Sequence, residues 1–127
     1  PMVQTDLTQL TRECTSWRDT LRNFRTDLSA YKEQLQAVVA RPISRSELPQ
    51  VEHYDNQIEI QLRNINQLKH EIKDHERNAT WELGNTSGNV SETTWSHHEA
   101  LLDRYGVLEH TLVELQDEFN AFMKKLA

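Results

Sequence analysis

Apolar side chains recur at alternating steps of three and four residues along three long stretches of this chain. In the first stretch every such position is apolar, and the residues are Leu7, Leu10, Cys14, Trp17, Leu21, Phe24, Leu28, Tyr31, Leu35 and Val38. This spacing gathers the apolar residues on one face of a helix, as in heptad repeats that pack against neighbouring helices. The pattern therefore predicts a long helix over about residues 5–40.

The last stretch repeats this spacing with one polar member. Its seam positions are His98, Leu101, Tyr105, Leu108, Leu112, Leu115, Phe119, Phe122 and Leu126. They predict a helix over about residues 90–126. Asn89 and Glu92 offer capping chemistry at its start, and Lys124 and Lys125 complement the negative dipole at its end.

The middle stretch contains QIEIQLRNINQLKHEIKDHE, residues 57–76, which carries two patterns. Its first residues alternate like a strand, but the alternation lasts only a few residues. The helical seam is longer, and its positions are Val51, Tyr54, Ile58, Gln61, Ile65, Leu68, Ile72 and His75. Length favours a helix over about residues 45–82, with Ser44 and Glu47 as a capping box at its start.

Prolines at 42 and 49 and glycines at 84 and 88 separate these three stretches. The connections are short relative to the helices, which favours antiparallel neighbours. We therefore predict an all-α fold: one domain over residues 1–127, an elongated up-down-up three-helix bundle with heptad, coiled-coil-like packing.

The turn lengths also predict which seam residues share a layer. Facing positions on the first and second helices sum to about 89, and those on the second and third to about 172. Cys14, His75 and His98 then meet in one layer, with Glu71 and His97 nearby and Trp17, Trp81 and Trp95 at the same end. Thiolate and imidazole suit zinc, so a zinc site is one interpretation. The other is a polar layer that closes the core, because no CxxC, HExxH or ExxH ligand motif occurs.

Gln61 is the second polar seam residue, in the layer of Leu28 and Leu112. A buried amide at a seam position fixes helix register at some cost in stability, and Asn64 is placed to share its hydrogen bonds. A position at the bundle edge, with the amide in water, is the alternative.

Apolar and small residues also fall on the outer faces of the predicted helices. Ile60 lies on the back of the second helix, and Gly106, Val107 and Val113 lie on the back of the third. Scattered exposed aliphatic residues are normal on soluble proteins. Because long heptad helices commonly self-associate, we expect these residues to bind a protein partner, with a homodimer as the leading form.

The charged residues bear on the choice of partner and on the ion pairs between helices. The net charge is −6, with 14 Lys and Arg against 20 Asp and Glu, which argues against nucleic acid as a partner. A basic group, Arg18, Arg22, Arg25 and Lys32, is expected to pair with acids on a neighbouring helix, in line with the acidic third helix.

The setting is expected to be cytoplasmic. The only cysteine, Cys14, excludes an internal disulfide, and no apolar run approaches the ~20 residues that span a bilayer. Sequons at Asn78, Asn85 and Asn89 are interpreted as a by-product of an Asn- and Ser-rich loop.

Three segments carry a resemblance: VEHYDNQ (51–57), LKHEIKDHE (68–76) and LQDEFNAFMKKL (115–126). They resemble segments of small bacterial coiled-coil proteins of unassigned role, which implies a cytoplasmic bacterial protein and assigns no functional residue. Three heptad helices with Trp17 in the first also look like a spectrin repeat, in architecture only.

The sequence therefore predicts a non-enzymatic helical interaction protein without a cofactor. No glycine-rich phosphate loop, nucleophile elbow or paired acid and base supports catalysis. The alternative function is a small zinc-binding bundle that uses Cys14, His75 and His98.

Overall fold

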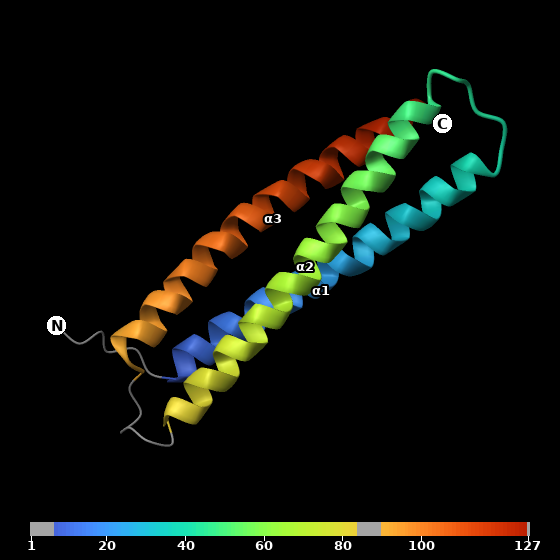
Figure 1. Cartoon of the computed structure of the whole chain (residues 1–127). Coiled ribbons are helices and arrows are strands. Elements are labelled where there is room, and N and C mark those ends of the chain that lie inside the picture. The colour runs from blue at the N-terminus through green and yellow to red at the C-terminus, as the bar shows by residue number, and fades with distance from the viewer. Residues whose placement is uncertain (1–6, 84–89, 127) are drawn as a thin grey trace.

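The computed structural model describes residues 7–83 and 90–126, and these residues form three helices without a strand. The helices are α1 (Leu7–Val39), α2 (Leu48–Leu83) and α3 (Glu92–Leu126). Figure 1 shows them side by side along one axis, with α2 antiparallel to α1 and α3. The predicted all-α, up-down-up three-helix bundle is confirmed. None of the described helices is long and apolar enough to cross a bilayer.

The apolar seams form the core. Every seam position that the spacing predicts on the three helices is buried or half-buried. Ile60, which the strand-like alternation would place with Ile58, is exposed, whereas Ile58 is fully buried. The helical interpretation of residues 57–76 is therefore correct, because the middle stretch packs along its three-four seam.

Helix α2 begins at Leu48, about three residues later than predicted, because residues 44–47 form a separate turn. The backbone N–H groups of Glu47 and Leu48 both donate to the Ser44 carbonyl, at 3.1 and 3.3 Å. The Ser44 N–H donates to Glu47 Oε1 at 3.2 Å, which is half of a capping box. The Ser44 hydroxyl donates to the same carboxylate at 2.7 Å and does not complete the other half. Pro49 then lies in the first turn, where a missing N–H costs little.

The start of α3 is held by Ser91 and by the end of α2. The predicted cap, Asn89, lies outside the described residues. Ser91 Oγ accepts the Thr94 N–H at 3.1 Å, as an N-cap side chain does. The Glu82 carboxylate on α2 accepts hydrogen bonds from the Ser91 N–H and the Thr94 hydroxyl. One carboxylate thus joins two helix ends across the connection between them. Of the three sequons, Asn78 lies on α2 and not in a loop, and Asn85 lies outside the described residues.

Helices α1 and α2 pack against each other most closely, and α3 packs less closely on both. Aromatic rings lie between α3 and its neighbours. Tyr31 stacks on Phe119 with ring centroids 4.5 Å apart, Tyr54 stacks on Phe122 at 4.9 Å, and Trp17 stacks on Tyr105 at 5.8 Å. Large rings hold helix axes further apart than aliphatic side chains do, which explains the wider spacing of α3.

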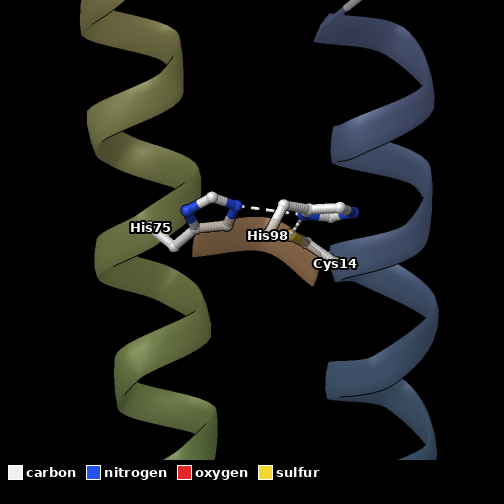
Figure 2. A group of neighbouring side chains, drawn as sticks. All are labelled: Cys14, His75 and His98. Carbon is white, nitrogen blue, oxygen red and sulfur yellow. Dashed lines mark hydrogen bonds between the residues drawn. The ribbon is translucent and has the colours of Figure 1, made fainter. Parts of the chain in front are cut away.

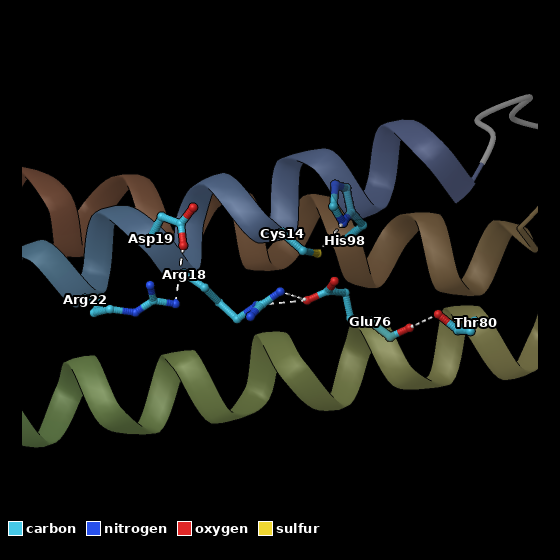
Figure 3. Close-up of polar contacts among 7 residues, drawn as sticks. All are labelled: Cys14, Arg18, Asp19, Arg22, Glu76, Thr80 and His98. Carbon is cyan, nitrogen blue, oxygen red and sulfur yellow. Dashed lines mark hydrogen bonds and ion pairs between the residues drawn. The ribbon is translucent and has the colours of Figure 1, made fainter.

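The basic residues of α1 pair mainly with α2, not with the acidic α3 that the charge distribution suggested. The Arg18 guanidinium lies 2.8 Å from Glu76 Oε1, and Lys32 pairs with Glu59. Arg22 pairs within α1, at 3.3 Å from Asp19 (Figure 3). Because α2 is the closest neighbour of α1, flanking side chains on α1 reach its acids first.

We predict that Glu82→Gln lowers the free energy of unfolding at neutral pH by about 1 kcal/mol, the usual contribution of a helix cap. Hydrogen bonds from Thr94 and Ser91 lower the pKa of the Glu82 carboxyl. A carboxyl with a lowered pKa contributes stability above its unfolded-state pKa, and the contribution disappears as the pH falls through the folded-state pKa. Denaturant unfolding at neutral and acidic pH should therefore show a difference that vanishes in acid. A difference of equal size at both pH values would contradict this role of the ionised carboxylate.

Candidate functional site

Cys14 of α1, His75 of α2 and His98 of α3 meet in the core, as the layer spacing predicts (Figure 2). The Cys14 Sγ, the His98 Nδ1 and a ring nitrogen of His75 all lie within 4.8 Å of one another. His75 Nε2 lies 3.0 Å from His98 Nδ1, and Cys14 Sγ lies 3.9 Å from the same nitrogen. The three residues are 0%, 3% and 1% exposed, in chain order. His98 Nδ1 is therefore the centre of a closed polar layer.

Glu13 sets the proton arrangement of this layer. Its Oε1 lies 2.7 Å from His98 Nε2, so this nitrogen donates to the carboxylate. With its hydrogen on Nε2, the His98 ring has a lone pair on Nδ1, which accepts the hydrogen of His75 Nε2. These tautomers are assigned from the hydrogen-bond network. On the far side of its ring, His75 Nδ1 is buried and has no hydrogen-bond partner.

Aromatic contacts hold the two imidazoles in place. The rings of Trp17 and Trp95 stack on His98, with centroids 4.7 and 5.1 Å away. His97 lies beside His75 at 4.8 Å. The third tryptophan predicted at this end, Trp81, is exposed and lines a surface groove with Arg18 and Arg77. Two of the three tryptophans therefore belong to the layer.

Burial keeps the Cys14 thiol and the His75 imidazole uncharged at neutral pH. Burial raises the pKa of the Cys14 thiol to about 12. The nearby Glu76 and Glu13 carboxylates raise it as well, whereas Arg18 lowers it. Burial also lowers the pKa of His75 to about 4, and the neighbouring His98 and His97 act in the same direction. The thiol thus keeps its proton and His75 remains neutral.

Cys14, His98 and Glu13 follow the order of a nucleophile, a base and an orienting carboxylate. A nucleophilic cysteine, however, needs a low pKa and access to its substrate. Cys14 has no exposed surface and a raised pKa. These properties suit a buried hydrogen-bonding group better than a nucleophile.

Glu13 is the member of the site that the sequence analysis missed. It directly precedes Cys14, so it flanks the seam on the α1 side, and that position was its only signal. Glu71, which was predicted to lie nearby, lines the hollow beside His75 together with His97. Glu71 forms a two-pronged pair with Arg104 of α3, with oxygen–nitrogen distances of 2.8 and 2.5 Å. Arg104 thereby holds the pKa of Glu71 below its usual range.

Gln61 is buried at 8% exposure, as the register interpretation predicts. Asn64 Nδ2 donates to Gln61 Oε1 at 3.2 Å, so the predicted sharing of hydrogen bonds is also confirmed. Gln61 lies at the edge of the core, because it also lines hollows on the surface between α2 and α3. Both interpretations of this residue therefore hold in part.

A groove follows the surface between α2 and α3. Its central hollow, of about 430 Å³, is lined by residues that include Gln61, Asn64, Leu68, Arg104, Val107 and Thr111. Two further hollows lie along the same seam, one beside Gln57 and Glu118 and one beside His75 and His97. Hollows also lie between α1 and α2, one beside Lys32 and Val51 and one beside Arg18 and Trp81, so the surface is hollowed on more than one side.

The predicted partner-binding residues are all exposed. Val107 is 69% exposed and lines the central hollow, and Val113 and Ile60 are also exposed. A Cβ placed on Gly106 would have no atom within 4 Å, so the bundle leaves open space beside this backbone. Of the predicted residues, Gly106, Val107 and Val113 lie on α3, and Ile60 lies on α2.

No protein-family model, curated protein sequence or solved structure matches the chain. The resemblance to bacterial coiled-coil proteins therefore stays a prediction, and function is argued from the geometry.

We predict that Cys14 is inert in the folded protein. A thiol reagent such as Ellman's reagent should label the native chain much more slowly than a small free thiol, because labelling requires unfolding of the bundle. In denaturant the same sample should label fully. Fast labelling of the native protein would show that the layer opens readily.

We predict that Gln61→Leu raises the free energy of unfolding by about 1 kcal/mol, because an apolar side chain replaces a buried amide whose partner, Asn64, can turn to water. Ile65→Val, in the same seam, serves as the control for altered packing. Denaturant unfolding measures the difference. A loss of stability in Gln61→Leu would contradict this prediction and show that the hydrogen bond from Asn64 outweighs the gain from apolar packing.

Proposed function

We propose that this chain is a non-enzymatic helical-bundle interaction protein, and that it self-associates through the outer face of α3 and the α2–α3 groove. The observation that carries the proposal is the groove, with the exposed Val107 at its wall. The cytoplasmic, bacterial setting is part of the proposal. It is supported by the resemblance of residues 51–57, 68–76 and 115–126 to small bacterial coiled-coil proteins.

The shape of the groove supports a helical partner. Two antiparallel helices with a hollow between them form a surface on which one more helix can bind, as in a four-helix bundle. The walls carry amides and a hydroxyl from Asn64, Gln67 and Thr111, and its apolar part comes from Leu68 and Leu108. An amphipathic helix can contact both kinds of surface.

The composition of the outer face of α3 supports the same conclusion. A stripe of small and apolar residues follows this face, and all of its members are exposed: Ala100, Gly106, Val107, Val113 and Ala121. The open space beside Gly106 allows the backbone of another helix to come near. A second copy presents the same stripe, so a twofold axis closes the assembly as a dimer.

We predict that light scattering gives a dimer mass for the wild type at high micromolar concentration, and a monomer mass for the Val107→Lys, Val113→Lys double variant. Two buried charges would oppose association, while both sites are exposed within one chain, so the fold should persist. Val39→Lys is the matched control. Val39 is 53% exposed and lies at the last residue of α1, away from the stripe.

A wild type that remains monomeric at these concentrations would exclude self-association through this face. Equal dissociation of the dimer by Val39→Lys would show that added charge, and not the stripe, controls assembly.

A further inference from the structure

We propose that Cys14, His75 and His98 bind one transition-metal ion, Zn²⁺ in the first instance, inside the bundle. The site is separate from the α3 surface of the proposed function. Its ligands are one sulfur and two imidazole nitrogens, the set that zinc accepts in proteins. Each ligand comes from a different helix, so a bound ion would connect all three.

The distances between the ligand atoms suit such an ion. Zinc bonds of ~2.3 Å to sulfur and ~2.1 Å to nitrogen, at tetrahedral angles, separate sulfur from nitrogen by ~3.6 Å and the two nitrogens by ~3.4 Å. The corresponding distances here are 3.9 Å from Cys14 Sγ to His98 Nδ1 and 3.0 Å from His98 Nδ1 to His75 Nε2. The third pair lies within 4.8 Å. Side-chain rotations that close it by about 1 Å complete the site.

Glu13 supplies the outer contact that metal-binding histidines usually have. Its carboxylate accepts the hydrogen of His98 Nε2 at 2.7 Å, and this bond fixes the ring with the Nδ1 lone pair turned to the centre of the layer. The stacked Trp17 and Trp95 rings restrict rotation of the same imidazole. His98 is therefore oriented as a ligand before any ion binds.

The protons also balance. On binding, the Cys14 thiol releases its proton to solvent and the thiolate bonds the ion. His75 moves its hydrogen from Nε2 to Nδ1, which frees Nε2 for the ion. The hydrogen bond from His75 Nε2 to His98 Nδ1 is replaced by a bond from each nitrogen to the ion. The hydrogen that moves to Nδ1 displaces no bond there, because this buried nitrogen has no partner among the described residues. His98 keeps the hydrogen on its own Nε2 and donates it to Glu13, so one proton leaves for each ion bound.

The α2–α3 groove provides the route to the site. Its hollow beside the layer, of about 440 Å³, is lined by His75 itself, with His97, Asp74 and Glu71 around it. Carboxylates and an imidazole at this position favour the approach of a cation. The three protein ligands leave the fourth tetrahedral position for a water molecule from this side.

The competing explanation is a metal-free polar layer in which Glu13, His98 and His75 satisfy one another by hydrogen bonds. It requires the same burial and the same Glu13 contact. It differs in one respect that can be measured: no ion would bind in proportion to the protein, and no ion would stabilise the fold.

The test uses the full chain, purified without a polyhistidine tag, stripped with a chelator and titrated with Co²⁺ and then with Zn²⁺. We expect saturation at one equivalent of Co²⁺, with the visible bands of tetrahedral cobalt and a near-ultraviolet thiolate-to-cobalt band. Because Cys14 is the only cysteine, the second band reports this residue alone. One equivalent of Zn²⁺ should abolish both bands and raise the melting temperature.

Matched variants locate the ion. Cys14→Ser should lose the near-ultraviolet band and the rise in melting temperature. Glu13→Gln should keep the one-to-one ratio but weaken binding about 10- to 100-fold, the usual effect of removing an outer contact. His70→Gln and His110→Gln remove exposed imidazoles that form only local pairs on their own helices, and they should bind like the wild type.

Absence of a one-equivalent cobalt spectrum from the folded wild type would overturn the proposal, and so would unchanged binding in Cys14→Ser. Loss of binding in His70→Gln or His110→Gln would assign the ion to the surface and also overturn it. If Cys14→Ser does not fold, Glu13→Gln decides, because Glu13 is partly exposed and an amide fits its place. Unchanged affinity in that variant would contradict the site.

Discussion

The structure depends on the burial of three apolar seams against one another. We do not expect the individual helices to be stable alone in water, because a helix of this kind gains most of its stability from packing its apolar face. Packing side chains of one seam between those of the next also fixes how far each helix is shifted along its neighbour. Once Val38 and Val51 are buried at one end, the layer of Cys14 and His75 follows at the other. The position of the candidate site is thus a consequence of the same register that builds the core.

Polar residues interrupt the apolar seams in two places, and their surroundings in the bundle differ. Gln61 lies where α3 is less closely packed, so its amide meets Asn64 and the groove, and its burial costs little. His75 and His98 are more deeply buried than Gln61, and burying a polar group without a partner is costly there. Glu13 reaches in from a half-buried position to complete their chain of hydrogen bonds. Leucine side chains at these positions would fill the core without polar groups. The presence of polar side chains here therefore requires a chemical explanation.

The spacing of apolar residues was sufficient to predict the helices, their order and the meeting of Cys14, His75 and His98, because heptad packing ties sequence distance to position in space. It could not predict Glu13 as a partner of His98, since a flanking side chain reaches either neighbouring helix depending on its rotamer. For the same reason it did not determine which neighbouring helix supplies the acids for the basic residues of α1, and Arg18 pairs with Glu76 on α2. The start of α2 depends on which hydrogen bonds Ser44 and Glu47 make, and the sequence pattern does not determine these bonds.

The aromatic residues connect the core site with the surface. Trp17 stacks on both His98 and Tyr105, so one indole fixes the imidazole and also separates α1 from α3. Tyr31 stacks on Phe119 between the same two helices, whereas Tyr54 of α2 stacks on Phe122 and separates α2 from α3. The groove between α2 and α3 is therefore not a packing defect. It is the outer side of an interface built from rings, and its hollow beside His75 gives the buried layer a connection to solvent. A bundle with leucines at these ring positions would draw α3 inward and close both the groove and this connection.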